Sequence, residues 1–191
     1  MSVKIIGHRG DPEHAPENTM TAFKKATQLG ADGIELDVHQ SRDRMLVVHH
    51  DETVKTPYGD WSIAHLTWSQ LKLIDVGDGE RMPTLTEVLR WAKREGVWLN
   101  VELKGEPFRY PGMERSVYQL IKTHGLIDQV LISSFHYGML QVLKQMDPGV
   151  SIGLLYYAKE FEPLGTALRI GAQALHPFFT SVSPQLVKDC H

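Results

Sequence analysis

Seven side chains that could take part in catalysis or metal binding lie within or directly after four short apolar segments of this 191-residue chain. They are two histidines, two cations and three carboxylates, namely His8, Arg9, Glu35, Asp37, His50, Glu102 and Lys104. Glu35 and Asp37 stand two positions apart, so on a strand both face the same side. Three carboxylates converging on one inner face repel each other unless a cation compensates. All-oxygen ligation predicts one divalent cation, Mg²⁺ or Ca²⁺ rather than Zn²⁺.

The histidines and the cations extend this predicted site. His8 and His50 are expected on either side of the metal, where two imidazoles can divide proton transfer near neutral pH. Arg9 and Lys104 place fixed positive charge where a phosphate could lie. Because neighbouring residues on a strand face opposite ways, only one of His49 and His50 should reach the site, and periodicity does not choose between them.

Taken alone, Glu35 with Asp37 is more typical of the solvated face of a strand, and Glu102 with Lys104 is more typical of a surface ion pair. Their joint occurrence at the ends of four segments favours a single site instead, since functional residues of parallel α/β folds gather at the carboxyl ends of strands. A metal, two histidines and two cations together predict phosphodiester cleavage.

Strand and helix patterns alternate along the chain, which predicts an α/β fold with parallel strands, either an open sheet or a closed barrel. We count seven strands, near residues 3–6, 33–38, 45–49, 97–103, 129–133, 150–155 and 172–176. Helices are expected from Asn18 or Thr19 to Gly30, from Thr84 to Gly96, near 113–123, 137–146 and 163–170, and from Ser183. The irregular stretch 51–82, with a small helix from Thr67, is interpreted as an insertion in a single domain spanning residues 1–191.

Composition excludes several classes of partner. The chain carries 20 Lys plus Arg against 23 Asp plus Glu, a formal charge of −3, so it lacks a basic footprint for nucleic acid. The longest nearly apolar stretch, residues 150–158, is about half of the roughly 20 residues that a membrane helix needs. The N-terminal residues lack a signal-peptide pattern, and the single Cys190 cannot form an internal disulfide. We therefore expect a cytoplasmic protein that acts on a small molecule.

Five sequence motifs together resemble the glycerophosphodiester phosphodiesterase family. They are His8-Arg9-Gly10, Pro16-Glu17-Asn18-Thr19, the run from Gly30 to Val38, Val47-Val48-His49-His50-Asp51, and Asn100-Val101-Glu102-Leu103-Lys104. The resemblance is strong over residues 4–104 and weaker up to the seventh strand. It implies a TIM (β/α)₈ barrel that hydrolyses glycerophosphodiesters, with a divalent metal, to glycerol 3-phosphate and an alcohol.

The resemblance also implies a role for each site residue. His8 and His50 are the catalytic histidines, and Glu35, Asp37 and Glu102 are the metal ligands. Arg9 and Lys104 contact the phosphate, and the insertion covers the glycerol end of the substrate. Which histidine is the base, and whether the metal is Mg²⁺ or Ca²⁺, the resemblance leaves open.

The chain departs from the family pattern at two places. Arg44 stands where the family usually has Gly, which affects turn geometry. A (β/α)₈ barrel typically takes about 250 residues, and this chain ends where an eighth strand is expected, so we expect a TIM barrel lacking its last strand and helix. Such an open barrel would be a truncated chain, a fragment, or a chain that covers its gap by self-association with a second copy, because exposed edges invite pairing.

Two other functions compete with metal-dependent hydrolysis. The chain could be a noncatalytic phosphodiester- or metal-binding module whose ligand set is intact although the barrel is incomplete. Alternatively it could be a lyase-like enzyme that releases cyclic phosphates, as related barrels do.

Overall fold

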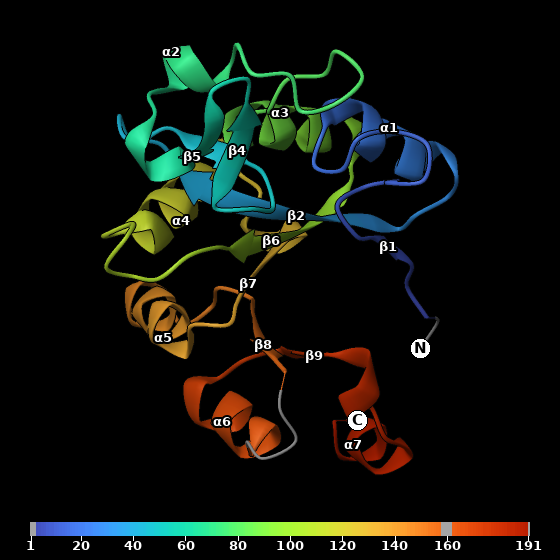
Figure 1. The fold of residues 1–191 in the computed structure, drawn as a ribbon. Helices are drawn as coiled ribbons and strands as arrows, with labels where there is room; N and C mark the ends of the chain where they lie inside the picture. The colour runs from blue at the N-terminus through green and yellow to red at the C-terminus, as the bar shows by residue number, and fades with distance from the viewer. Residues whose placement is uncertain (1–2, 158–161, 191) are drawn as a thin grey trace.

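The computed structural model describes residues 3–157 and 162–190. Its main feature is a curled sheet of six parallel strands with helices on its outer face (Figure 1). In sheet order the parallel strands are β1 (Ile6–Gly7), β2 (Gly33–Gln40), β6 (Trp98–Leu103), β7 (Val130–Ser134), β8 (Ile152–Tyr156) and β9 (Ala174–Pro177). The expected α/β barrel without its last elements is thereby confirmed.

One of the seven expected strands runs the other way. β3 (Leu46–Val48) pairs antiparallel with β2, with Val38 opposite Val48 and Gln40 opposite Leu46. The expectation that all seven strands are parallel is therefore wrong. Only residues 41–45 connect β2 to β3, whereas a parallel crossover needs about a dozen residues or more.

The helices follow the strands as the alternation predicts. They are α1 (Met20–Gln28), α2 (Trp68–Leu71), α3 (Leu85–Glu95), α4 (Met113–His124), α5 (Tyr137–Met146), α6 (Pro163–Ile170) and α7 (Pro184–Asp189), with the short 3₁₀ helices η1 (Ile63–His65), η2 (Ile127–Gln129) and η3 (Phe179–Ser181). The expected helix from Thr84 to Gly96 is α3, where Thr84 and Glu87 form a capping box and Gly96 ends the helix in the left-handed conformation. Among the described residues, each helix is too short or too polar to cross a lipid bilayer.

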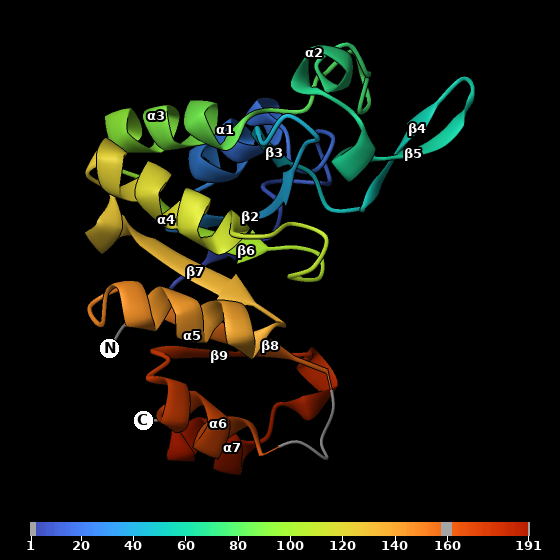
Figure 2. The same ribbon diagram turned by 90° about the vertical axis from the view of Figure 1, so that its left-hand side faces the viewer.

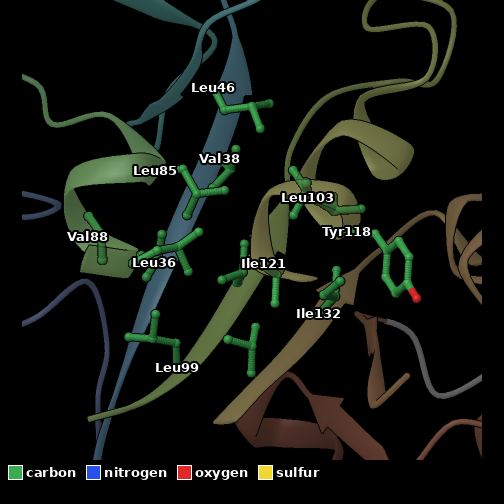
Figure 3. Packing of buried hydrophobic residues seen from close by; sticks show 14 of the residues in the cluster. Leu36, Val38, Leu46, Leu85, Val88, Leu99, Leu103, Tyr118, Ile121 and Ile132 are labelled. Atoms are coloured by element: carbon green, nitrogen blue, oxygen red, sulfur yellow. The ribbon is translucent and has the colours of Figure 1, made fainter. Parts of the chain in front are cut away.

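The core lies between the sheet and its outer helices. Figure 3 shows Leu85 and Val88 of α3 facing Leu36 and Val38 of β2. These side chains are fully buried, and each such burial stabilises the fold by about 1.5–3 kcal/mol. Because side chains alternate along β2, packing this face against the helices turns the charged face inward.

The stretch expected as an insertion contains a hairpin that the sequence pattern did not predict. β4 (Thr53–Thr56) and β5 (Gly59–Ser62) pair antiparallel and project from the end of the sheet at which the strands finish (Figure 2). The insertion packs through a separate hydrophobic cluster that includes Val54, Ile63 and Leu71. β1 and β9 form the two edges of the described sheet, and pairing of second copies through these edges stays a prediction.

Candidate active site

Three carboxylates meet on the inner face of the sheet. Glu35 and Asp37 lie on β2 and Glu102 on β6, where Asp37 and Glu102 are paired in register. Each contributes an oxygen, and these oxygens all lie within 4.8 Å of one another. All three residues are buried. The structure thus brings together the three predicted metal ligands.

The loop between β1 and α1 holds two of these carboxylates in place. The Arg9 backbone N–H donates to Glu35 Oε2 at 2.9 Å. Asn18 Nδ2 donates to Asp37 Oδ2 at 2.8 Å, and the Asp37 backbone N–H donates to Asn18 Oδ1 at 3.2 Å. Arg9 and Asn18 both adopt left-handed φ values, 56° and 58°. Thr19 caps α1 instead of Asn18, which leaves Asn18 free to orient Asp37, a role the sequence did not reveal.

The two predicted phosphate-binding cations lie against the carboxylates. Lys104 Nζ is 3.0 Å from Glu102 Oε1 and 3.4 Å from Asp37 Oδ1. Arg9 Nε is 3.4 Å from Asp37 Oδ2, and its Nη1 binds Glu17 at 3.0 Å. Although burial works against the ammonium, Asp37 and Glu102 together raise the pKa of Lys104.

Charge at this cluster is not balanced by the protein alone, since two cations face three buried carboxylates. Burial and the neighbouring Asp37 raise the pKa of Glu35 well above its usual range, and the same two causes raise the pKa of Glu102. Glu35 Oε1 is buried and has no hydrogen-bond partner among residues 3–157 and 162–190. An orphaned carboxylate oxygen beside two others is the donor set that a hard divalent cation prefers, so the residues fit the implied metal.

His8 and His50 line one cavity of about 300 Å³ together with Arg9, Glu102 and Lys104. Burial, followed by the Arg9 charge, lowers the pKa of His8. His50 Nδ1 lies 2.8 Å from Asp51 Oδ1, so this nitrogen donates and Nε2 is left for the cavity.

The structure separates His50 from its neighbour His49. His49 lines a different pocket beside Thr53 and Val76 of the insertion, and burial lowers its pKa. Of the two histidines that periodicity left open, only His50 reaches the cavity that contains His8.

A buried pair behind His50 was missed by the sequence reading. His39 Nε2 lies 3.1 Å from the His50 carbonyl oxygen, and His39 Nδ1 lies 3.0 Å from Tyr110 Oη. A carbonyl only accepts, so Nε2 carries the proton and Nδ1 accepts from Tyr110. Burial lowers the pKa of His39 to about 4 and raises that of Tyr110 to about 12. We expected His39 just past the strand, but it lies inside β2 on the face of Glu35 and Asp37, where the two-residue period could have placed it.

Comparisons with known proteins identify the family of the chain. The sequence model of the glycerophosphoryl diester phosphodiesterase family matches residues 8–191. A glycerophosphodiester phosphodiesterase of Caldanaerobacter subterraneus is 42% identical over 198 residues, covering 100% of this chain and 82% of the relative. One from Bacillus altitudinis is 36% identical, covering 91% of this chain and 75% of the relative.

A solved structure of a phosphodiesterase has a similar fold. An Oleispira antarctica phosphodiesterase, solved in complex with the product sn-glycerol-3-phosphate, matches with a TM-score of 0.89 at 29% identity. The match covers 98% of this chain and 79% of that one. Sequence, fold and the inner carboxylate cluster therefore agree: the chain belongs to the glycerophosphoryl diester phosphodiesterase family and is a phosphoric diester hydrolase.

Proposed function

We propose that this chain hydrolyses glycerophosphodiesters to glycerol 3-phosphate and an alcohol, in a reaction that depends on one divalent cation, Mg²⁺ or Ca²⁺. The observation that carries the proposal is the buried cluster of Glu35, Asp37 and Glu102 beside the cavity lined by His8 and His50. The product bound to the Oleispira antarctica phosphodiesterase supports glycerol 3-phosphate as the product here. A cytoplasmic location is part of the proposal and rests on the single free Cys190.

The carboxylates would hold the cation, which supplies charge neutralisation at a phosphate oxygen and makes a nearby hydroxyl easier to deprotonate. Lys104 and Arg9 would contact the remaining phosphate oxygens. Both side chains line the cavity with the histidines, and the fork of Arg9 suits a phosphate better than a point charge does.

The two histidines would divide the proton transfers. Burial lowers the pKa of His8, which favours the neutral imidazole, so His8 is suited to take the proton from a glycerol hydroxyl that attacks phosphorus. His50 Nδ1 is held by the Asp51 carboxylate at 2.8 Å, which leaves Nε2 for the cavity, so His50 would protonate the departing alcohol oxygen. Loss of the alcohol would leave a cyclic phosphate on the glycerol. Water would then open this cyclic phosphate to glycerol 3-phosphate, with the histidine roles reversed.

The test is release of glycerol 3-phosphate from glycerophosphodiesters, after chelation and again after Mg²⁺ or Ca²⁺ is returned. We expect activity to vanish with the chelator and return with the metal, while circular dichroism shows a folded chain throughout. Folded protein without turnover in either metal would favour the noncatalytic module. Phosphorus NMR that shows cyclic phosphate persisting as the final product would favour the lyase.

A pair of neighbouring variants tests the histidine roles. His50→Ala should lower kcat by about 10²–10⁴-fold, the usual contribution of a positioned acid or base. His49→Ala is the matched control, because its side chain lies in a different pocket, and it should retain turnover. Equal losses in the two folded variants would contradict the assignment of His50.

A further inference from the structure

Five Phe and Tyr side chains line the same cavity as the catalytic histidines, on the part of the sheet away from the carboxylates. Tyr156 belongs to β8, and the other four follow the strands; we call these four the aromatic wall, and they are Phe135 after β7, Tyr157 after β8, and Phe178 and Phe179 after β9. The wall comes from the carboxyl ends of three successive strands in sheet order, where ligand-binding residues of parallel folds gather. Nothing in the proposed proton transfers uses these rings.

The rings form one continuous surface. Phe135 and Tyr157 stack at 4.4 Å with an angle of 8° between their planes, and Tyr157 lies 6.1 Å from Phe178. Phe178 and Phe179 are 4.7 Å apart. Tyr157 and Phe179 are nevertheless 68% and 74% exposed. Contiguous exposed aromatic surface of this kind marks a binding site more often than it marks a structural core.

The two sides of the cavity suit the two ester groups of a glycerophosphodiester differently. Free hydroxyls on the glycerol need polar surroundings, and the polar side of the cavity, which includes Arg9, Glu102 and Lys104, lies beside β1, β2 and β6. The aromatic wall offers ring faces instead. With the phosphate between the histidines, the alcohol on the other ester bond falls against the wall.

The chemistry of the wall selects among alcohols. Ring faces attract cations, and a quaternary ammonium has no N–H groups that require acceptors. A primary ammonium gains less on this wall, because its N–H groups need acceptors and, among the described residues lining the cavity, Glu102 is the one carboxylate and it is paired with Lys104. A cavity of about 300 Å³ suits a compact head group better than a long chain.

We propose that the aromatic wall binds the trimethylammonium group of choline esters and makes glycerophosphocholine the preferred substrate. This inference rests on the proposed function. Tyr157 is the central ring, because it contacts both Phe135 and Phe178, and its substitution removes one face while keeping the others.

The test compares kcat/KM for three substrates that differ only in the alcohol. They are the choline ester, the ethanolamine ester and the 3,3-dimethylbutyl ester, which has the shape of choline without its charge. We expect the choline ester to be favoured over each of the others by about 5-fold or more, the worth of one cation–π contact. Tyr157→Leu should remove most of that preference and leave the ethanolamine ester nearly unchanged, whereas Tyr157→Phe should retain it.

Two outcomes would overturn the proposal. Equal turnover of the choline and dimethylbutyl esters would show a wall that recognises shape and apolarity alone. Equal loss on all three substrates in Tyr157→Leu would show a general effect on the site.

A binding measurement separates failure of this proposal from failure of the proposed function. Saturation-transfer NMR of glycerophosphocholine is run in chelator, where no turnover is expected. Saturation at the N-methyl protons that is lost in Tyr157→Leu supports the wall even if no ester is ever hydrolysed. Turnover without that saturation would leave the enzyme proposal intact and refute the wall.

Discussion

Removing the Tyr110 hydroxyl tests how far the placement of His50 depends on the two buried hydrogen bonds that link Tyr110, through His39, to the His50 carbonyl oxygen. Tyr110 Oη donates to His39 Nδ1, and His39 Nε2 donates to the His50 carbonyl oxygen. His39 is 0% exposed and Tyr110 is 2% exposed, so water does not replace a lost partner. Tyr110→Phe keeps the ring, which packs edge-on against His39, and deletes only the oxygen.

Two effects of different size are expected. A buried nitrogen without its partner costs about 1–3 kcal/mol of unfolding free energy. Without the hydroxyl nothing holds the Nδ1 side of the His39 ring, so the ring can shift toward the space left by the oxygen; this weakens the Nε2 bond to the His50 carbonyl and loosens the position of His50. A misplacement of about 1 Å can cost as much as 10²-fold in rate, and we expect kcat to fall about 10-fold. KM should change little, because Tyr110 is not among the residues that line the cavity.

Steady-state kinetics and urea unfolding measure the two effects in the same variant. Tyr118→Phe is the matched control, since Tyr118 lies on α4 and its hydroxyl donates at 2.7 Å to Asp147, directly after α5, outside the cavity. It should lose about 1 kcal/mol of stability and retain kcat. If Tyr110→Phe likewise lost stability with kcat intact, the two buried hydrogen bonds would be structural only.

Three further outcomes follow from charge and backbone geometry. In chelator, Glu35→Gln should raise the unfolding free energy by about 1 kcal/mol, because one of three repelling buried carboxylates is gone; it should also shrink the rise in Tm that Mg²⁺ produces, and a lower apo stability would contradict this. The Arg81 guanidinium lowers the pKa of Glu87 to about 2, so Glu87→Gln should cost under about 1 kcal/mol at pH 7 for this half-exposed pair. That difference should persist above pH 4.5 and disappear as the pH falls toward 2, and urea melts at pH 7 and pH 2.5 that show a constant difference would refute the ion pair. Arg44 has a φ of 65°, so Arg44→Gly should relieve about 1 kcal/mol of strain and raise Tm by about 2–4 °C in calorimetry, an expectation that a lower Tm would contradict.

The parts of the site that lie on regular strands were predictable from the sequence. The two-residue period along β2 predicts Glu35 and Asp37 on one face and the apolar side chains of the strand on the other. In the structure Ile34, Leu36 and Val38 lie in the core, and Glu35 and Asp37 lie together on the opposite face. The three carboxylates also meet on the inner face as predicted, while the cation that their repulsion indicates stays a prediction. The placement of these side chains was predictable because strand alternation is a local property that tertiary packing does not change.

Other features depend on information that periodicity does not carry. The hairpin of β4 and β5 is mostly exposed, so it shows little of the hydrophobic alternation by which strands are recognised. The antiparallel direction of β3, by contrast, was predictable from the sequence, because the connection between β2 and β3 is too short for a parallel crossover. The positions of Arg9 and Asn18 follow from left-handed backbone in a loop; Asn is enriched in that conformation and Arg is not, and hydrophobic periodicity marks neither position.

Chemistry and alcohol recognition are built on different parts of the sheet. The carboxylate cluster stands on β2 and β6, where Asp37 and Glu102 are neighbours in register, and its geometry is set by the rigid centre of the sheet. The aromatic wall stands on the residues that follow β7, β8 and β9, which touch none of the three carboxylates in a hydrogen bond or ion pair among the contacts of the described chain. Substitutions in the wall can therefore change which alcohol is accepted without moving the groups that act on phosphorus. The converse also holds, because a change at Glu35 alters charge at the cluster while the stacked rings of Phe135 and Tyr157 keep their mutual contact.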